Sequence, residues 1–273
     1  MDNTLFVSDL DGTLLSPDGH LSQTTADIIN HLIGQGMLFT LATARSVVSA
    51  GECFEKLHLQ CPCILMNGTF LYNSASRQFV KAHQIPAGAD KKVIEIYERA
   101  GRLPYKYGFD GSEISIQYRQ TYHEYDDLFI AARKPKYRSF ERVEQYSYEN
   151  PTVFINALDR YETLAPVYKE LCQIESLTNV FYKDSYYDGI WFCESFSSQA
   201  SKANAIGELK KMLGVSKVVV FGDNYNDLSM FRAADEGIAV KGAVEELKEL
   251  ATEVIDGNEE DAVARYLLKR LGK

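Results

Sequence analysis

Four short stretches of the chain carry the acidic, basic and hydroxyl side chains that chemistry on a phosphate group needs. They are DLDG at residues 9–12, ATAR at 42–45, ASK at 200–202 and GDNYND at 222–227. Carboxylates gathered in one place raise one another's pKa values unless cations offset their charge. Mg²⁺ prefers oxygen ligands and is often held by one or two carboxylates and a substrate phosphate, so this ion and Lys202 would offset the charge. The set therefore suits phosphoryl transfer, in which positioning and charge neutralisation supply most of the catalysis.

The spacing of Asp9 and Asp11 favours two roles in one reaction. Side chains two residues apart on an extended segment point to the same side. One carboxylate can attack phosphorus and form an aspartyl-phosphate. The other can protonate the leaving oxygen and later deprotonate water. Gly12 allows a tight turn and a close approach of backbone to phosphate. Asp-x-Asp-Gly by itself is also common in surface turns, so the prediction rests on all four stretches together.

DLDG, ATAR and GDNYND can meet if each follows a strand of one parallel sheet, because ligands bind at the carboxyl ends of such strands, and Lys202 would join them from a helix start. Apolar runs that alternate with amphipathic segments provide the elements. Strands are expected at 4–10, 37–43, 63–67, 217–223, 236–240 and 252–256, and helices at 23–36, 46–58, 197–214, 224–234 and from 243 and 259. The pattern predicts an α/β fold with a Rossmann-like parallel-sheet core and helices on both faces.

The pattern changes between residues 84 and 194, where we expect an inserted α+β domain. Fourteen of the 17 tyrosines lie between Tyr97 and Tyr187. A hairpin is expected at 69–83, just before the insert. Within the insert, the expected elements are a hairpin at 104–118, helices at 122–134 and 160–175, and strands at 152–158, 179–183 and 188–194. The core would then consist of 1–83 and 195–273, with hinges near 82–87 and 193–199.

Composition narrows the class of protein. The net charge is −9, which argues against binding to nucleic acid or to an anionic membrane. We find no signal-peptide pattern and no run of about 18 apolar residues. The five cysteines have irregular spacing and match no zinc site. Reduced, mostly buried thiols in a cytoplasmic protein are expected.

The motifs resemble those of the haloacid dehalogenase superfamily of phosphatases, and the long insert resembles the cap of its Cof-type branch. DLDGTL at 9–14 resembles the first motif, Thr43 in ATAR the second, Lys202 in ASKANAI the third and GDNYNDLSM at 222–230 the fourth. Two departures are Ala203, where the family commonly has glycine, and NGT at 67–69 in place of NGA. Neither removes a carboxylate, so we expect an active enzyme.

The resemblance implies a role for each residue. Asp9 would be the nucleophile and a Mg²⁺ ligand. Asp11 would be the general acid and base and would bind Mg²⁺ through its backbone carbonyl. Asp223 would complete the protein ligands, with Asp227 behind it, and Arg45 would face the cap. The residues that would hold the phosphate are Thr43, Lys202, Asn226 and the backbones of Leu10 and Ala44.

A Mg²⁺-dependent phosphatase for a small phosphorylated metabolite, such as a sugar phosphate, is the function that these features favour. The alternatives are a phosphomutase or phosphotransferase of the same superfamily, which would shield the intermediate from water, and a non-catalytic regulator that binds a phosphorylated metabolite. The regulator would have no chemical need for Asp11. The basic stretch at 133–142 and the tyrosines of the insert could contact substrate, although solvated surface and core packing are their commoner uses.

Overall fold

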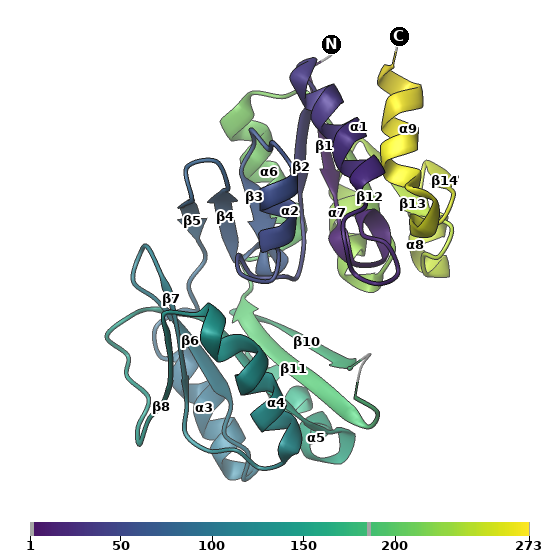
Figure 1. Ribbon diagram of the computed structural model, residues 1–273. Coiled ribbons are helices and arrows are strands. Elements are labelled where there is room, and N and C mark those ends of the chain that lie inside the picture. Colours follow the sequence, from purple (N-terminus) through teal and green to yellow (C-terminus); the bar gives the residue numbers. More distant parts are fainter. Residues whose placement is uncertain (1–2, 185–186, 273) are drawn as a thin grey trace. The chain divides into compact units, whose positions relative to one another are not determined.

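The computed structural model describes residues 3–184 and 187–272 (Figure 1). The chain folds as two compact units. We call Met1–Lys81 with Ser201–Lys273 the core unit, and Ala82–Ala200 the insert unit. None of the described helices combines the length and the apolar content that crossing a bilayer demands.

The core unit is built on a parallel sheet with the strand order β14-β13-β12-β1-β2. Its strands are β1 (Thr4–Ser8), β2 (Leu38–Leu41), β12 (Lys217–Gly222), β13 (Glu236–Val240) and β14 (Glu253–Ile255). β1 and β12 lie side by side in the middle of this sheet and are buried almost throughout, as expected for parallel strands that are covered on both faces. The predicted α/β fold class is confirmed.

Helices cover both faces of the core sheet. They are α1 (Gln23–Gly34), α2 (Gly51–Lys56), α6 (Lys202–Leu213), α7 (Leu228–Ala233), α8 (Glu245–Leu250) and α9 (Ala262–Leu271). Figure 1 shows α1 and α9 together in front of the sheet and α6 and α7 behind it. Ser22 begins α1, because its hydroxyl accepts a hydrogen bond from the Thr25 amide.

Several expected elements of the core unit differ from the structure, among them the helix predicted for 197–214, which begins only at Lys202. A helix was predicted for 46–58, but the structure has only α2 in this range. The side chains of Ser46 and Ser49 hydrogen-bond to each other and to nearby backbone, and these bonds compete with helical hydrogen bonds. The third strand, β3 (Cys63–Leu65), is not paired along its length with the core sheet and is linked to it by an isolated bridge between Ala42 and Ile64. It forms a separate sheet with β4 (Phe70–Asn73) and β5 (Gln78–Ala82).

The insert unit has a six-stranded sheet with the order β10-β11-β9-β6-β7-β8. The strands are β6 (Tyr105–Phe109), β7 (Ile114–Tyr118), β8 (Ser139–Arg142), β9 (Thr152–Arg160), β10 (Leu177–Lys183) and β11 (Ile190–Ser197). The helices are α3 (Ala89–Arg99), α4 (Glu124–Arg133) and α5 (Tyr161–Leu171). α3 and α5 share one hydrophobic core with β9 and β11, whereas Phe129 of α4 packs on rings of the opposite sheet face. The sequence analysis missed α3 and β8.

The end of the insert unit lies later in the chain than expected. The hinge predicted at 193–199 is wrong over 193–197, because these residues form the end of β11. The boundary expected between residues 194 and 195 falls inside this strand. Ser195 is buried in this strand, and its hydroxyl donates a hydrogen bond to the Asn179 side chain on β10. The hinge at 82–87 stays a prediction. All five cysteines are free thiols, and all but Cys172 are buried.

A buried ion cluster in the insert unit allows a stability prediction. Arg102 is 1% exposed, and its guanidinium lies 2.7 Å from Asp126 and 3.1 Å from Asp159. Arg102→Leu would leave two buried carboxylates without this cation, so we expect the free energy of unfolding to fall by about 3–5 kcal/mol. Urea unfolding measures this. Arg99→Leu breaks the exposed pair with Glu170 and should cost less than about 1 kcal/mol. Equal losses in the two variants would contradict the prediction.

Candidate active site

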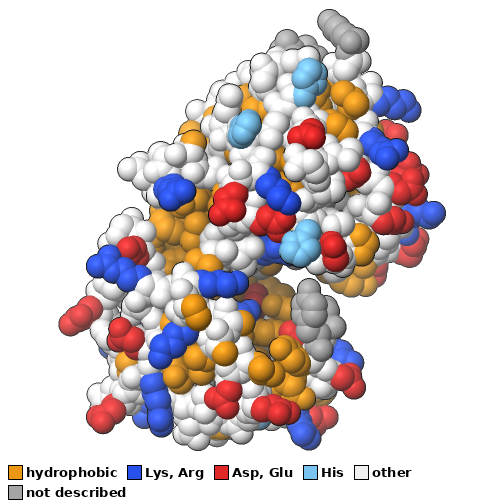
Figure 2. All heavy atoms as spheres, viewed as in Figure 1, with side chains coloured by type: hydrophobic (Ala, Val, Ile, Leu, Met, Phe, Trp, Pro, Cys, Tyr) orange, Lys and Arg blue, Asp and Glu red, His pale blue; other side chains and the backbone are white. Residues whose placement is uncertain are grey.

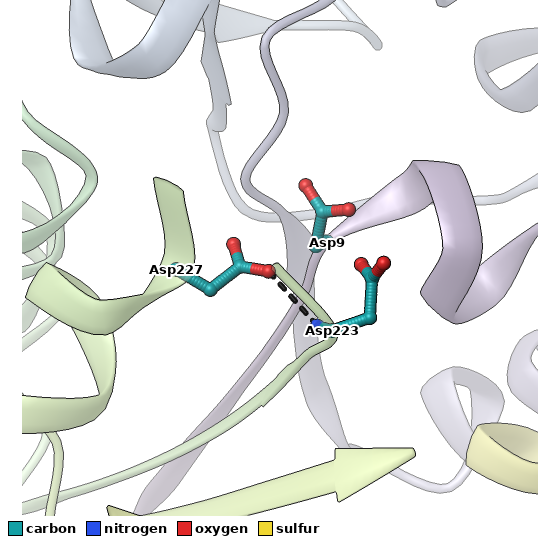
Figure 3. Close-up of side chains that lie close together, drawn as sticks. All are labelled: Asp9, Asp223 and Asp227. Carbon is teal, nitrogen blue, oxygen red and sulfur yellow. Dashed lines mark hydrogen bonds between the residues drawn. The ribbon is translucent and has the colours of Figure 1, made fainter. Parts of the chain in front are cut away.

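Three aspartates meet at the carboxyl ends of β1 and β12. Asp9 follows β1 and Asp223 follows β12, and the two strands pair directly, with Ser8 opposite Phe221. Asp227 comes from the short turn that precedes α7. One carboxylate oxygen of each aspartate lies within 4.8 Å of the others (Figure 3).

Lys202 joins two of these carboxylates from the start of α6. Its Nζ lies 2.5 Å from an oxygen of Asp9 and 2.6 Å from an oxygen of Asp227. The lysine side chain is 1% exposed, so both ion pairs are shielded from water. Ser201 fixes the helix start, because its hydroxyl accepts a hydrogen bond from the Asn204 amide. The third and fourth predicted stretches therefore meet the first in space.

The electrostatics of the cluster keep Lys202 charged. Burial by itself lowers the pKa of Lys202, but Asp227 and Asp9 outweigh this and raise it above its usual value. Burial raises the pKa of Asp9 well above its ordinary range, against the opposing effect of Lys202. Burial and the charge of Asp227 raise the pKa of Asp223 to about 6. The site thus holds more negative charge than one lysine balances.

The hydrogen bonds separate the three aspartates into two kinds. Asp227 uses both oxygens, because one accepts from Lys202 and the other from the backbone amides of Asp223 and Asn224. Asp9 and Asp223 each use one oxygen within the described chain, toward Lys202 and Thr13 respectively. Asp9 and Asp223 can therefore offer a ligand oxygen to a metal, and hard carboxylate oxygens are what Mg²⁺ prefers. The carboxylates of Asp9 and Asp223 therefore fit a Mg²⁺ site, and Asp227 holds Lys202 and the backbone of Asp223 beside it.

The turn after β1 is shaped around Asp223. Gly12 has φ +80°, and a Cβ atom at this position would lie 2.3 Å from an oxygen of Asp223. The neighbouring Thr13 donates a hydrogen bond of 2.9 Å to the other oxygen of Asp223. The absence of a side chain at Gly12 therefore lets the backbone of this turn lie against the Asp223 carboxylate. The sequence analysis gave Thr13 no role, although it lies within the quoted DLDGTL motif.

Asp11 lies apart from the cluster, on the surface, where Arg45 binds it. Nε of Arg45 lies 2.9 Å from one oxygen of Asp11, and Nη2 lies 2.5 Å from the other. Asp9 is 4% exposed whereas Asp11 is exposed, and the expectation that the two side chains point to the same side stays a prediction. Alternation applies only within the strand, and β1 ends at Ser8.

The other predicted residues lie on the loops beside the cluster. Thr43 is buried, and its hydroxyl accepts a hydrogen bond of 3.0 Å from the Arg45 amide. Leu10 is buried in the turn after β1. Ala44 and Asn226 are exposed on the loops after β2 and β12.

The loop at 66–69 braces the site and was missed as a functional element. Met66 and Asn67 have φ of +48° and +54°, values that non-glycine residues rarely adopt. The Asn67 amide donates to the carbonyl of Thr43, and Gly68 packs against the backbone of Ser201. Such strain collects at functional sites. The signal in the sequence was NGT at 67–69, directly after an apolar run.

A substitution at Gly68 tests this brace. A Cβ atom there would lie 2.4 Å from the carbonyl oxygen of Ser201, so Gly68→Ala must displace the residue that precedes Lys202. We expect kcat/KM for a phosphate ester to fall by about tenfold or more, because small misplacements of catalytic groups are costly. Gly36→Ala is the control, since Gly36 also has a positive φ but has open space at Cβ. Equal activity of the two variants would show that the brace does not matter.

Comparison with known proteins identifies the family. The family of haloacid dehalogenase-like hydrolases matches residues 6–267, and the chain belongs to this family. A haloacid dehalogenase-like hydrolase of Bacteroides thetaiotaomicron has a similar fold, with a TM-score of 0.80 at 22% identity over 98% of this chain and 99% of that one. The predicted resemblance is confirmed.

Two relatives with named phosphatase activities match over nearly the whole chain. One is the 5-amino-6-(5-phospho-D-ribitylamino)uracil phosphatase YitU of Bacillus subtilis, 24% identical over 96% of each chain. The other is the pyridoxal phosphate phosphatase YbhA of Escherichia coli, 23% identical over 99% of this chain and 100% of the relative.

Proposed function

We propose that this protein is a Mg²⁺-dependent phosphatase that hydrolyses a small phosphorylated metabolite through an aspartyl-phosphate on Asp9. Its enzyme class, a hydrolase of phosphate monoesters, follows from its family and relatives. The observation that carries the mechanism is the buried pairing of Asp9 with Lys202 beside Asp223. Lys202 fixes the Asp9 carboxylate through one oxygen, and of the two carboxylate oxygens one would hold Mg²⁺ while the other would attack phosphorus.

In the first step, one carboxylate oxygen of Asp9 attacks phosphorus, and the bond from phosphorus to the leaving oxygen breaks. Asp11 donates a proton to that oxygen, so the product leaves as an alcohol. In the second step, Asp11 takes a proton from water, which attacks phosphorus and releases phosphate from Asp9. Because Arg45 holds both oxygens of Asp11 in this structure, the side chain must turn away from Arg45 to act.

The remaining residues position the phosphate and the metal. Mg²⁺ would be held by Asp9, Asp223 and the backbone carbonyl of Asp11, and when bound it neutralises charge on the phosphoryl group. Asp227 would hold Lys202 and the Asp223 backbone in place. The phosphate contacts proposed from the motifs are Thr43, Lys202, Asn226 and the backbones of Leu10 and Ala44. An ammonium and backbone amides are well suited to bind phosphate oxygens.

Hydrolysis of p-nitrophenyl phosphate, followed by a panel of phosphorylated metabolites, tests the proposal. We expect turnover with Mg²⁺ and loss of nearly all turnover with excess EDTA, because without the metal Asp9 and Asp223 lack their counter-charge. Turnover should recover when Mg²⁺ is added back. Heat-denatured protein provides the blank. Full activity in EDTA would overturn the metal-dependent mechanism, and inactivity on every ester would overturn the phosphatase.

A further inference from the structure

β10 is the longest strand at an open sheet edge in the described part of the chain. The other edge strands, β2, β3, β5, β8 and β14, span three to five residues, whereas β10 spans seven. Proteins usually protect an edge by short length, prolines, bulges or charges, because its free backbone groups can pair with another chain. β10 reads LTNVFYK, with no proline and its only charge at the last residue, and it pairs with β11 without a bulge. This edge is therefore poorly protected.

Alternate residues of β10 turn their backbone groups toward the open edge. The Ser198 amide donates to the carbonyl of Ser176, and these two residues continue the register of β10 with β11. In an antiparallel pair, every second residue bonds the neighbouring strand, so the even-numbered residues of β10 face β11. The amides and carbonyls of Asn179 and Phe181 therefore point to the other side, where the described sheet has no further strand.

Aromatic side chains cluster beside this edge on the face that α5 covers. Phe181 of β10 stacks on Trp191 with ring centres 4.7 Å apart and on Tyr168 at 5.2 Å. Tyr161 at the start of α5 packs on Phe181 and Trp191 and is 49% exposed. Figure 2 shows hydrophobic side chains gathered on the insert unit over β11. Aromatic residues are enriched in the buried centres of protein interfaces, so the edge and its surroundings suit a protein partner.

We propose that β10 pairs with β10 of a second copy of this chain, antiparallel about a two-fold axis at Asn179. The Asn179 backbone groups of the two copies then bond each other, and the Phe181 amide of each copy bonds the carbonyl of the partner's Leu177. The Leu177 amide is not needed, because it already donates to Ile174. The same strand contributes both halves of the interface, as in closed two-fold dimers, and the two six-stranded sheets become one.

Charges favour this register. With the axis at Asn179, Lys183 of one copy lies opposite the partner's Glu175, an exposed residue of the turn before β10 that has no ion pair with another described residue. Moving the axis by one residue toward Lys183 would place Leu177 there instead and lose the pairing of opposite charges, which fixes register in interfaces. Lys183 is free to change partner, because its contact with Asp188 is exposed to solvent and weak.

Sedimentation velocity over a concentration series tests the pairing. We expect the wild type to dimerise. Lys183→Glu and Glu175→Lys should each raise the dissociation constant by about tenfold or more, because either change sets like charges opposite each other twice in the symmetric interface. The double variant restores opposite charges and should regain wild-type association. Lys136→Glu is the matched control, since it makes the same charge change just before β8, at the opposite edge of the same sheet.

Hydrogen exchange tests which strand forms the interface. The outward amides of Asn179 and Phe181 should exchange rapidly in the monomer and become protected as the concentration rises. Equal melting temperatures of the charge variants and the wild type in dilute solution would show that the fold is intact.

A wild type that stays monomeric at every concentration at which it is soluble would overturn the proposal. A dimer that leaves these two amides unprotected, or that the double variant fails to restore, would place the interface elsewhere and also overturn it. Protection of the same amides in the monomer would mean that this chain covers its own edge, which excludes the pairing. Each of these outcomes leaves the phosphatase function untouched, because the pairing uses no residue of the candidate active site.

Discussion

Asp9→Asn is expected to lower kcat for p-nitrophenyl phosphate by about 10³-fold or more, because removal of a nucleophile eliminates the covalent route. The amide has the size of the carboxylate but cannot attack phosphorus. Lys202 keeps its second partner, Asp227, so the buried ammonium stays paired in the variant. The variant should therefore stay folded, with a near-ultraviolet circular dichroism spectrum like that of the wild type.

The control for this substitution is Asp18→Asn, which removes an exposed carboxylate from the same segment of the core unit. The exposed Asp18 carboxylate accepts hydrogen bonds from the Ser16 hydroxyl and the His20 amide, both in its own loop. Because these contacts are local and at the surface, the substitution should leave kcat within about twofold of the wild type. A rapid acid quench with substrate labelled in its phosphate group detects the aspartyl-phosphate directly. Label should stay on the wild-type protein and be absent from Asp9→Asn. Turnover in Asp9→Asn within tenfold of the wild type would exclude Asp9 as the nucleophile.

The strand ends were predictable because their signal is local. Each consists of an apolar, β-branched run followed at once by polar residues, as at Val7 to Asp9 and Val220 to Asp223. Parallel strands bring such ends to one edge of the sheet, and the structure places Asp9, Asp223 and Lys202 together there. Chain order and spacing thus sufficed for the cluster, since each contact is a consequence of the sheet topology.

Other features were not predictable because they depend on contacts between distant segments. Thr13 finds Asp223, and Gly68 packs on Ser201, only after the chain has folded. The pairing of Asp11 with Arg45 joins two separate loops, which no periodicity can indicate. α3 has a helical apolar face, with Val93, Ile94 and Tyr97 buried, but the many charged residues between them hid the pattern.

Lys202→Met is expected to be the most destabilising change in the core unit. Methionine has a similar length but no charge, so Asp9 and Asp227 would stay buried without their cation. Breaking a buried ion pair from one side costs about 3–5 kcal/mol, and urea unfolding at pH 8 measures it. Activity should also fall by about 10²-fold or more, because the lysine both fixes Asp9 and would neutralise the phosphate.

The pH dependence of this loss distinguishes uncompensated charge from lost packing. Burial already raises the pKa of Asp9 and brings that of Asp223 to about 6, and removal of the lysine raises both further. A group with a raised pKa in the folded state contributes stability at low pH and loses it as pH rises through that pKa. The stability difference from the wild type should therefore grow above about pH 6.

Lys210→Met, which breaks an exposed pair on the same helix, should cost less than about 1 kcal/mol. A loss in Lys202→Met that is independent of pH would show that the methionine disturbs packing, and that the lysine does not act as a counter-charge.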